Sequence, residues 1–454
     1  MASQRLRLLG PLWFVASAWA AGLAWTAHAQ AAAGKLLKGP YLTGLSESGV
    51  EVRFESDAPA PAAVEFVGEG DAGPGRTFED GSSTAMHVVR AVGLASACPY
   101  AYAVRMAGAV VGRGHFTTAP RADAGSPLKL LVYGDDRTDP VAHAAVVRAL
   151  AATPSDVLVN TGDLVEDGAR ASDWQTFFDV ERALLRDRAL FVAIGNHELY
   201  QDSAGASFAR YFGFDDVTRG KQLFGTVRLG QVRLFFLNAM HEWSTGDERR
   251  WLEKELARAD DEPGLLWRIA VVHQGPWSSG PHGPNANLVA ARVPELLAAH
   301  GVDLILSGHD HIYERGASGS LKYIVSGGGG APLYRIAELA PSARKSESTY
   351  HFVEIGAARD GVRIVARRID GSVLERCGFA KGLPWDCDDP SGAASRPGDA
   401  PAAVDRPRSA VQQSGSSRCG CAVVGARDNH ERVAGSAVLA SALFWAAKLR
   451  RRRR

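Results

Sequence analysis

The stretch VDLILSGHDHIYER, residues 302–315, joins a run of apolar residues to two histidines. The apolar run is typical of a buried strand, and His309 and His311 follow its end. Residues i and i+2 of an extended chain point to the same face, so we expect both imidazoles to face one side. Paired imidazoles at a strand end suggest a metal site if other ligands reach the same place.

Four further apolar runs end in polar residues, namely LVYGDDR (131–137), DVLVNTGD (156–163), FVAIGNHE (191–198) and IAVVHQ (269–274). Because ligands of open α/β sheets bind beyond the carboxyl ends of strands, we expect these polar residues to converge. A single aspartate in such a place could cap a helix, but five such strand ends favour a metal site. The candidate metal ligands are Asp135, Asp163, Asn196, His273, His309 and His311.

These side chains offer the ligands that a pair of ions needs. Two ions about 3.5–4 Å apart require a bridging anion, for which one aspartate suffices, together with imidazoles and carboxylate or amide oxygens. This ligand set suits Fe, Zn or Mn, and water bound to such ions has a lowered pKa. The sequence therefore predicts two divalent or trivalent metal ions and attack of a metal-bound hydroxide on a phosphate ester.

The pattern of strand and helix signals along the chain predicts two folded parts. Short β-prone runs over residues 36–118 indicate a small β-sandwich. Strands alternate with helices over residues 128–370, which predicts an α/β domain. We expect its helices near 140–152, 172–187 with Ser172 or Asp173 as the cap, 246–259 and 287–299.

The two ends of the chain indicate export and attachment to the cell surface or outer membrane. A basic start, an apolar run and Ala27-His28-Ala29 predict a signal peptide over residues 1–29. Residues 388–418 have the composition of a disordered linker. Residues 419–454 combine cysteines, an apolar stretch and an arginine cluster, and predict a membrane tail. That order resembles the myxobacterial type of C-terminal sorting tail.

Composition sets broad limits on function. The chain has 454 residues and a formal net charge of +1, so it lacks the basic footprint of a nucleic-acid-binding protein. The oligomeric state is not indicated. An exported chain permits disulfides, and Cys377 and Cys387 flank a short segment and could pair.

The motifs GD-x-R, GDLVEDG, GNHE, VVHQ and GHDHIYER, in this order, resemble the calcineurin-like metallophosphoesterase superfamily. The β-rich front part and GHDHIYER are similar to its purple-acid-phosphatase branch. The resemblance implies an α/β fold, a four-layer αββα sandwich preceded by a fibronectin-III-like β-sandwich. It also implies that Asp135, Asp163 and His311 hold a first metal ion, and that Asp163, Asn196, His273 and His309 hold a second. His197 would protonate the leaving oxygen or stabilise the phosphoryl oxygens.

Two positions depart from the family pattern. Purple acid phosphatases carry a tyrosine where this chain has Glu166, which could bind metal or face solvent. Arg137 stands where many superfamily members have a histidine ligand and purple acid phosphatases tend to have glycine. Arginine cannot ligate a cation, but it could bind a substrate phosphate or pair with Asp135. We expect a more loosely bound first metal and assign Arg137 to catalysis.

The remaining polar residues near the motifs have secondary roles. We expect Asp310 to support a histidine ligand, and Glu314 and Arg315 to brace their loop. His282 and Trp277 could contact substrate, although solvation and packing explain them almost as well. The glycine-rich stretch 325–334 lacks a Walker ending and predicts a tight turn.

The favoured function is hydrolysis of phosphomonoesters. Phosphodiester or nucleotide hydrolysis is the alternative within enzymes. A surface binding protein that has lost turnover is the alternative from another class, and the retention of every motif argues against it.

Overall fold

The computed structural model describes residues 34–69, 75–216 and 220–388. The predicted signal peptide (1–29) and membrane tail (419–454) lie outside this part of the chain, as does the predicted linker apart from its first residue. Within the described residues, no helix has the length and apolarity to span a bilayer.

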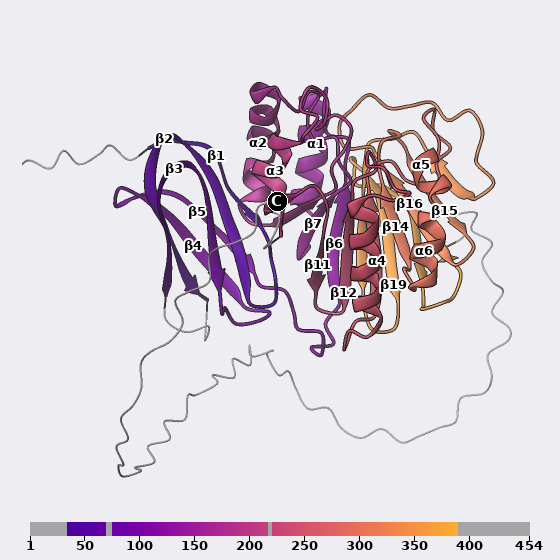
Figure 1. The fold of residues 1–454 in the computed structure, drawn as a ribbon, viewed down its shortest axis with the longest axis horizontal. Coiled ribbons are helices and arrows are strands. Elements are labelled where there is room, and N and C mark those ends of the chain that lie inside the picture. Colours follow the sequence, from indigo (N-terminus) through magenta and orange to yellow (C-terminus); the bar gives the residue numbers. More distant parts are fainter. Residues whose placement is uncertain (1–33, 70–74, 217–219, 389–454) are drawn as a thin grey trace, which may run out of the picture.

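The first five strands form the β-rich front part, which lies at one end of the molecule (left in Figure 1). They are β1 (Leu36–Thr43), β2 (Gly49–Gly68), β3 (Arg76–Val92), β4 (Pro99–Met106) and β5 (Ala109–Thr117). The long strand β2 pairs with β1 along its first half and with β4 along its second, and β3 follows it throughout. Register shifts between Glu55 and Ala62 mark the change of partner.

The front strands enclose an apolar core. Every second residue of β4 is buried, and Phe54, Phe66, Tyr102 and Phe116 belong to the same buried cluster. The β-prone runs 49–56 and 62–68 form one continuous strand in the structure. The irregular pairing in its middle lets the strand bend without ending.

Two sheets form the rest of the protein. The first has the order β21-β20-β19-β18-β6-β7-β8 and continues through β1 into the front part. Its strands are β6 (Leu128–Tyr133), β7 (Val157–Asn160), β8 (Ala189–Val192), β18 (His351–Ala357), β19 (Val362–Arg368), β20 (Val373–Phe379) and β21 (Asp386–Cys387). A disulfide between Cys377 and Cys387 links β20 to β21.

The second sheet has the order β11-β12-β13-β14-β16-β15-β17. Its strands are β11 (Gly225–Leu229), β12 (Val232–Leu237), β13 (Trp267–Val272), β14 (Leu304–Ser307), β15 (Tyr313–Ser318), β16 (Leu321–Ser326) and β17 (Ala343–Glu347). A separate short hairpin joins β9 (Phe214–Asp216) to β10 (Gly220–Gln222). Strands β12, β13, β14 and β16 run parallel, as do β6, β7 and β8 in the first sheet.

Helices cover the outer face of each sheet (Figure 1). They are α1 (Pro140–Ala151), α2 (Ala171–Leu185) and α3 (Ala206–Phe212) on the first sheet, and α4 (Asp247–Asp260), α5 (Ala286–Ala290) and α6 (Val293–Ala299) on the second. One buried cluster joins Val132 and Val159 of the first sheet to Leu234 and Leu306 of the second. The predicted four-layer αββα arrangement is therefore confirmed.

Two helix predictions need correction. The stretch 287–299 forms two short helices, because Arg292 adopts a left-handed φ of 55° and Pro294 occupies the first turn of α6. Helix α2 begins at Ala171 without a side-chain cap, so the predicted cap by Ser172 or Asp173 is wrong. Asp173 lies in the first turn instead, where a negative charge favours the helix dipole.

Candidate metal centre

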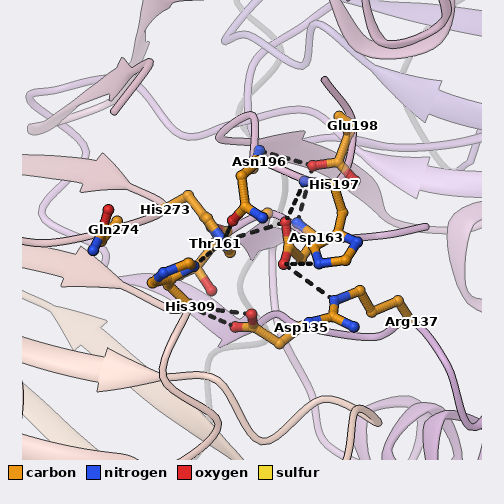
Figure 2. A network of polar contacts seen from close by, with 12 residues as sticks. Asp135, Arg137, Thr161, Asp163, Asn196, His197, Glu198, His273, Gln274 and His309 are labelled. Atoms are coloured by element: carbon orange, nitrogen blue, oxygen red, sulfur yellow. Dashed lines mark hydrogen bonds and ion pairs between the residues drawn. The ribbon is translucent and has the colours of Figure 1, made fainter. Parts of the chain in front are cut away.

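The predicted ligands all follow the carboxyl ends of parallel strands. Asp135 follows β6, Asp163 follows β7, Asn196 follows β8, His273 follows β13, and the two histidines of the opening stretch follow β14. Facing sheets bring these ends to one edge of the molecule. Figure 2 shows Asp135, Asp163, Asn196, His273 and His309 turned toward a common centre.

Four donor groups meet at the middle of this centre. Nε2 of His273 lies 3.2 Å from Oδ1 of Asp163 and 3.2 Å from Oδ1 of Asn196. Nδ1 of His309 lies 3.1 Å from the same Nε2 atom. The carboxylate, the amide oxygen and two imidazole nitrogens are ligands that a divalent transition-metal ion prefers. The donor set therefore fits a cation.

Backbone carbonyls orient three of the histidine rings. Nδ1 of His273 lies 2.9 Å from the carbonyl oxygen of Thr161, and Nδ1 of His311 lies 2.6 Å from that of Pro332. Nδ1 of His197 lies 2.8 Å from the carbonyl oxygen of Glu166. A ring that donates through Nδ1 keeps the Nε2 lone pair for a metal or a substrate. All three rings are therefore fixed with Nε2 directed inward.

The charge states suit cation binding. Burial lowers the pKa of His309 to about 3 and that of His311 to about 4, so both rings are neutral at pH 7. Burial opposes ionisation of Asp163, but His273, His197 and Arg137 together hold its pKa well below the ordinary range. Neutral imidazoles beside an ionised carboxylate are the forms that bind metal. Burial opposes protonation of His273, but Asp163, Asp135 and Glu198 raise its pKa to about 9, so this ring must release a proton when metal binds.

Left-handed backbone conformations cluster at the centre. Asp135, Asp163 and His309 have φ values of 61°, 58° and 69°, a region that non-glycine residues rarely occupy. The conformation at His309 overturns the expectation of an extended chain over 309–311, although both rings still reach the centre. The backbone N–H of His309 donates to Asp135 at 3.0 Å, and the backbone N–H of His197 donates to Asp163 at 3.1 Å. These bonds stabilise the strained turns.

Close backbone approaches also require glycine. Gly162 has a φ of 105°, and a Cβ there would lie 2.8 Å from the carbonyl oxygen of Ala193. A Cβ on Gly329 would lie 2.2 Å from Oδ1 of Asp136. The glycine-rich stretch 325–334 therefore passes tightly beside the centre, as the sequence suggested.

Arg137 and Glu166 interact with each other beside the centre. Nε of Arg137 lies 3.2 Å from Oδ2 of Asp163, and its Nη1 lies 3.0 Å from Oε2 of Glu166. Glu166 also accepts a hydrogen bond from the Thr138 hydroxyl at 2.6 Å. The guanidinium thus pairs with Asp163 and Glu166 rather than with Asp135. Asp135 lies 3.6 Å from Nε2 of His311.

The structure places the other predicted residues around this group. Nε2 of His197 is 4.0 Å from Oδ2 of Asp163, and its side chain is 21% exposed, so it faces the open side. The ring of His282 lies 4.4 Å from that of His309. Asp310 is buried and accepts from the Ser278 hydroxyl and the His282 backbone N–H. Asp310 thus holds the 278–282 loop.

Three further residues take bracing or packing positions. Trp277 packs against Tyr323 with ring centroids 5.4 Å apart, which favours its packing interpretation. Glu314 accepts from the Tyr323 hydroxyl at 3.0 Å, and Arg315 pairs with Glu375 at 2.9 Å. Both residues lie in strand β15, so these contacts hold that strand against β16 and β20, and the expected loop is wrong.

Two residues of the centre had no assigned role in the sequence. Glu198 is fully buried and accepts from the backbone N–H groups of Gly195, Asp163 and Leu164 at 2.7, 3.0 and 2.7 Å. Tyr334 stacks on His311 with ring centroids 4.0 Å apart. Glu198 is the last residue of the GNHE motif, so the sequence drew attention to it. Its role could not be predicted, because a buried carboxylate that accepts from backbone N–H groups has no characteristic spacing in the sequence.

Comparisons with known proteins point to one family. Residues 139–313 match the family model of the calcineurin-like phosphoesterases. An uncharacterised protein of Mycobacterium tuberculosis is 26% identical over 282 residues, 53% of each chain. Purple acid phosphatase 15 of Arabidopsis thaliana is 30% identical over 134 residues, 28% of this chain and 25% of its own length. The chain spans about half the length of the first curated relatives it matches.

Solved structures share the fold. The purple acid phosphatase from yellow lupin (Lupinus luteus) seeds has a TM-score of 0.65 at 19% identity, covering 75% of this chain and 74% of that one. PhoD has a TM-score of 0.63 at 10% identity, covering 79% of this chain and 93% of that one. With the motifs and the convergent strand ends, these matches identify residues 139–313 as a calcineurin-like phosphoesterase domain and make the chain similar to purple acid phosphatases in sequence and fold.

Proposed function

We propose that this protein is a metal-dependent phosphoric ester hydrolase that acts on phosphomonoesters. The observation that carries the proposal is the convergence of Asp163, Asn196, His273 and His309 on one point, with Arg137 and His197 beside it. A guanidinium, an imidazole and a cation site together suit a dianionic phosphate.

The residues that would hold a metal ion are Asp163, Asn196, His273 and His309. An ion held there supplies a nucleophile at neutral pH and neutralises charge on the phosphoryl oxygens. The purple-acid-phosphatase likeness would assign Asp135, Asp163 and His311 to a second ion, but the proposed hydrolysis requires only the ion at the four-ligand cluster. Fe, Zn and Mn all suit these ligands.

Two further side chains would act on the substrate itself. Arg137 would donate N–H groups to the phosphoryl oxygens, as arginine commonly does. His197 is oriented by the Glu166 carbonyl oxygen, 2.8 Å from Nδ1, so Nε2 faces the open side. Its ring would donate a proton or hydrogen bond to the leaving oxygen.

A comparison of two chromogenic substrates tests the proposal. The full chain, freed of metal and reloaded with Zn²⁺, Mn²⁺ or Fe, should hydrolyse p-nitrophenyl phosphate faster than bis-p-nitrophenyl phosphate. The His273→Ala variant should lose this activity, while His115→Ala, at a strongly exposed histidine of β5, should keep it. Faster turnover of the diester would favour the phosphodiesterase alternative. No turnover with any metal would favour a silent binding protein.

We also propose that the protein is exported and attached to the cell surface or outer membrane by its C-terminal tail. The support is the sequence of residues 1–29 and 419–454. Fractionation of cells that make the full chain, or a chain ending at residue 388, tests this. The full chain should be found with membranes and the shortened chain in the medium or periplasm, whereas equal distribution would contradict the proposal.

A further inference from the structure

We propose that the guanidinium of Arg137 takes the place of the first metal ion, so that the centre binds one ion per chain rather than two. This inference rests on the proposed function, because it concerns the metal centre of that same site. It replaces the binuclear centre with a mononuclear one whose second positive charge is a side chain.

The two oxygens of the Asp163 carboxylate face different partners. Oδ1 lies 3.2 Å from Nε2 of His273, on the side of the four-ligand cluster. Oδ2 lies 3.2 Å from Nε of Arg137, which approaches from the other side (Figure 2). A carboxylate that bridges two ions would divide its oxygens in this way. Here one of the two partners is a guanidinium.

The remaining ligands of a first ion are engaged as well. Nη2 of Arg137 lies 3.5 Å from Nε2 of His311, the ring nitrogen that such an ion would need. Both carboxylate oxygens of Asp135 accept from the backbone N–H of His309, at 3.1 and 3.0 Å. The guanidinium therefore lies among the side chains that the family likeness assigns to the first ion.

The exchange at residue 166 fits an arginine better than a metal. Glu166 binds Nη1 of Arg137 at 3.0 Å and the Thr138 hydroxyl at 2.6 Å. It thus holds the guanidinium in place. The two departures form one pair of contacting residues.

The Arg137 guanidinium and a first metal ion cannot occupy the same place. A guanidinium stays charged in proteins and offers no lone pair, so it repels a cation and cannot ligate one. The Arg137 side chain is only 12% exposed, which limits the solvent that could screen this repulsion. It can still stabilise phosphoryl oxygens through its N–H groups.

Metal stoichiometry distinguishes one ion from two. Calorimetric titration of the apo full chain with Zn²⁺ or Mn²⁺, with metal analysis after gel filtration, should give one ion per chain. The His273→Ala variant should bind none. The matched His311→Ala variant should still bind one, with a dissociation constant within about threefold of the wild type. Circular dichroism checks that each variant is folded.

The Arg137→His variant tests whether Arg137 is the reason that only one ion binds. It removes the guanidinium and puts an imidazole, a metal-ligand type, in its place, so it should take up a second ion. A folded variant that still binds one ion would overturn the role given to Arg137. Two ions on the wild type, with one lost in His311→Ala, would overturn the inference and leave the proposed function standing. A wild type that binds no ion would contradict both.

Discussion

Nε2 of His273 and Nδ1 of His309 lie 3.1 Å apart, each on the inward side of its ring. These nitrogens come from loops after two neighbouring strands, β13 and β14. Two imidazole lone pairs at this separation repel each other unless a proton or a metal ion lies between them. We therefore expect a metal ion to displace the proton between these rings and to stabilise the folded state.

Metal removal should lower the thermal stability of the protein. An ion that binds only the native state stabilises it by about 2.7 kcal/mol at a free concentration 100 times the dissociation constant. We expect chelation to lower the Tm by several degrees and Zn²⁺ or Mn²⁺ to restore it. Differential scanning calorimetry measures the change.

The His309→Ala variant tests whether the stabilising metal ion is held at the four-ligand cluster. It should show little response to chelation, while His115→Ala should respond as the wild type does. An unchanged metal response in His309→Ala would contradict the assignment of this ring to the centre.

His197 should affect turnover without affecting metal content. It is anchored through Nδ1 at 2.8 Å from the Glu166 carbonyl oxygen, outside the four-ligand cluster. General acid–base groups contribute about 10²–10⁴-fold to rate, so His197→Gln should lower kcat by about 100-fold or more. KM should change little. Steady-state kinetics with p-nitrophenyl phosphate and metal analysis measure both.

The matched control for this substitution is His300→Gln. His300 pairs with Asp260 at the end of α4, away from the centre. It should keep wild-type kinetics. Loss of metal in His197→Gln would instead make His197 a ligand.

The sequence predicted which residues meet, because strand ends carry a simple signal. Asp163 and His273 are distant in the chain, yet each follows a buried apolar run, and parallel strands bring their carboxyl ends to one edge. This reasoning needed only the strand pattern. It placed the candidate ligands together without knowledge of any side-chain conformation.

The sequence did not predict how the backbone reaches that edge. His309 has a φ of 69°, where an extended chain was expected, because a carboxylate outside the local window stabilises the turn. The partners of Arg137 were also hidden, since Glu166 lies 29 residues away in another loop. Long-range contacts of this kind override local preferences.

Glu198 should be required for the shape of the centre. Its buried carboxylate accepts from four backbone N–H groups that belong to the turns after β7 and β8. Each buried donor left without a partner costs about 1–3 kcal/mol. Glu198→Ala should therefore destabilise the apo protein by about 3 kcal/mol or more and weaken metal binding. Urea denaturation and calorimetric titration measure the two effects.

Glu47→Ala provides the control, because Glu47 is exposed in the front part. Its substitution should change stability by less than about 0.5 kcal/mol. A Glu198→Ala protein with normal metal affinity would show that the turns hold their shape without this carboxylate.

Glu51 should give the front part a defined dependence of stability on pH. It accepts from Thr43 at 2.9 Å, from Arg53 at 2.6 Å and from Arg90 at 2.8 Å. Burial opposes its ionisation, but Arg53 and the hydrogen bonds from Arg90 and Thr43 lower its pKa from about 4.5 to about 2. Because the folded-state pKa is the lower one, the stabilisation is complete above pH 4.5 and declines as pH falls toward 2.

The Glu51→Gln variant isolates this dependence. A shift from 4.5 to about 2 corresponds to at most about 3 kcal/mol at neutral pH. The difference in unfolding free energy between wild type and variant should therefore be largest near pH 6 and shrink steadily between pH 4.5 and 2. Urea denaturation of apo protein at several pH values measures it, with Glu47→Gln as the control. A difference that stays constant over this range would show that Glu51 acts through packing rather than through its charge.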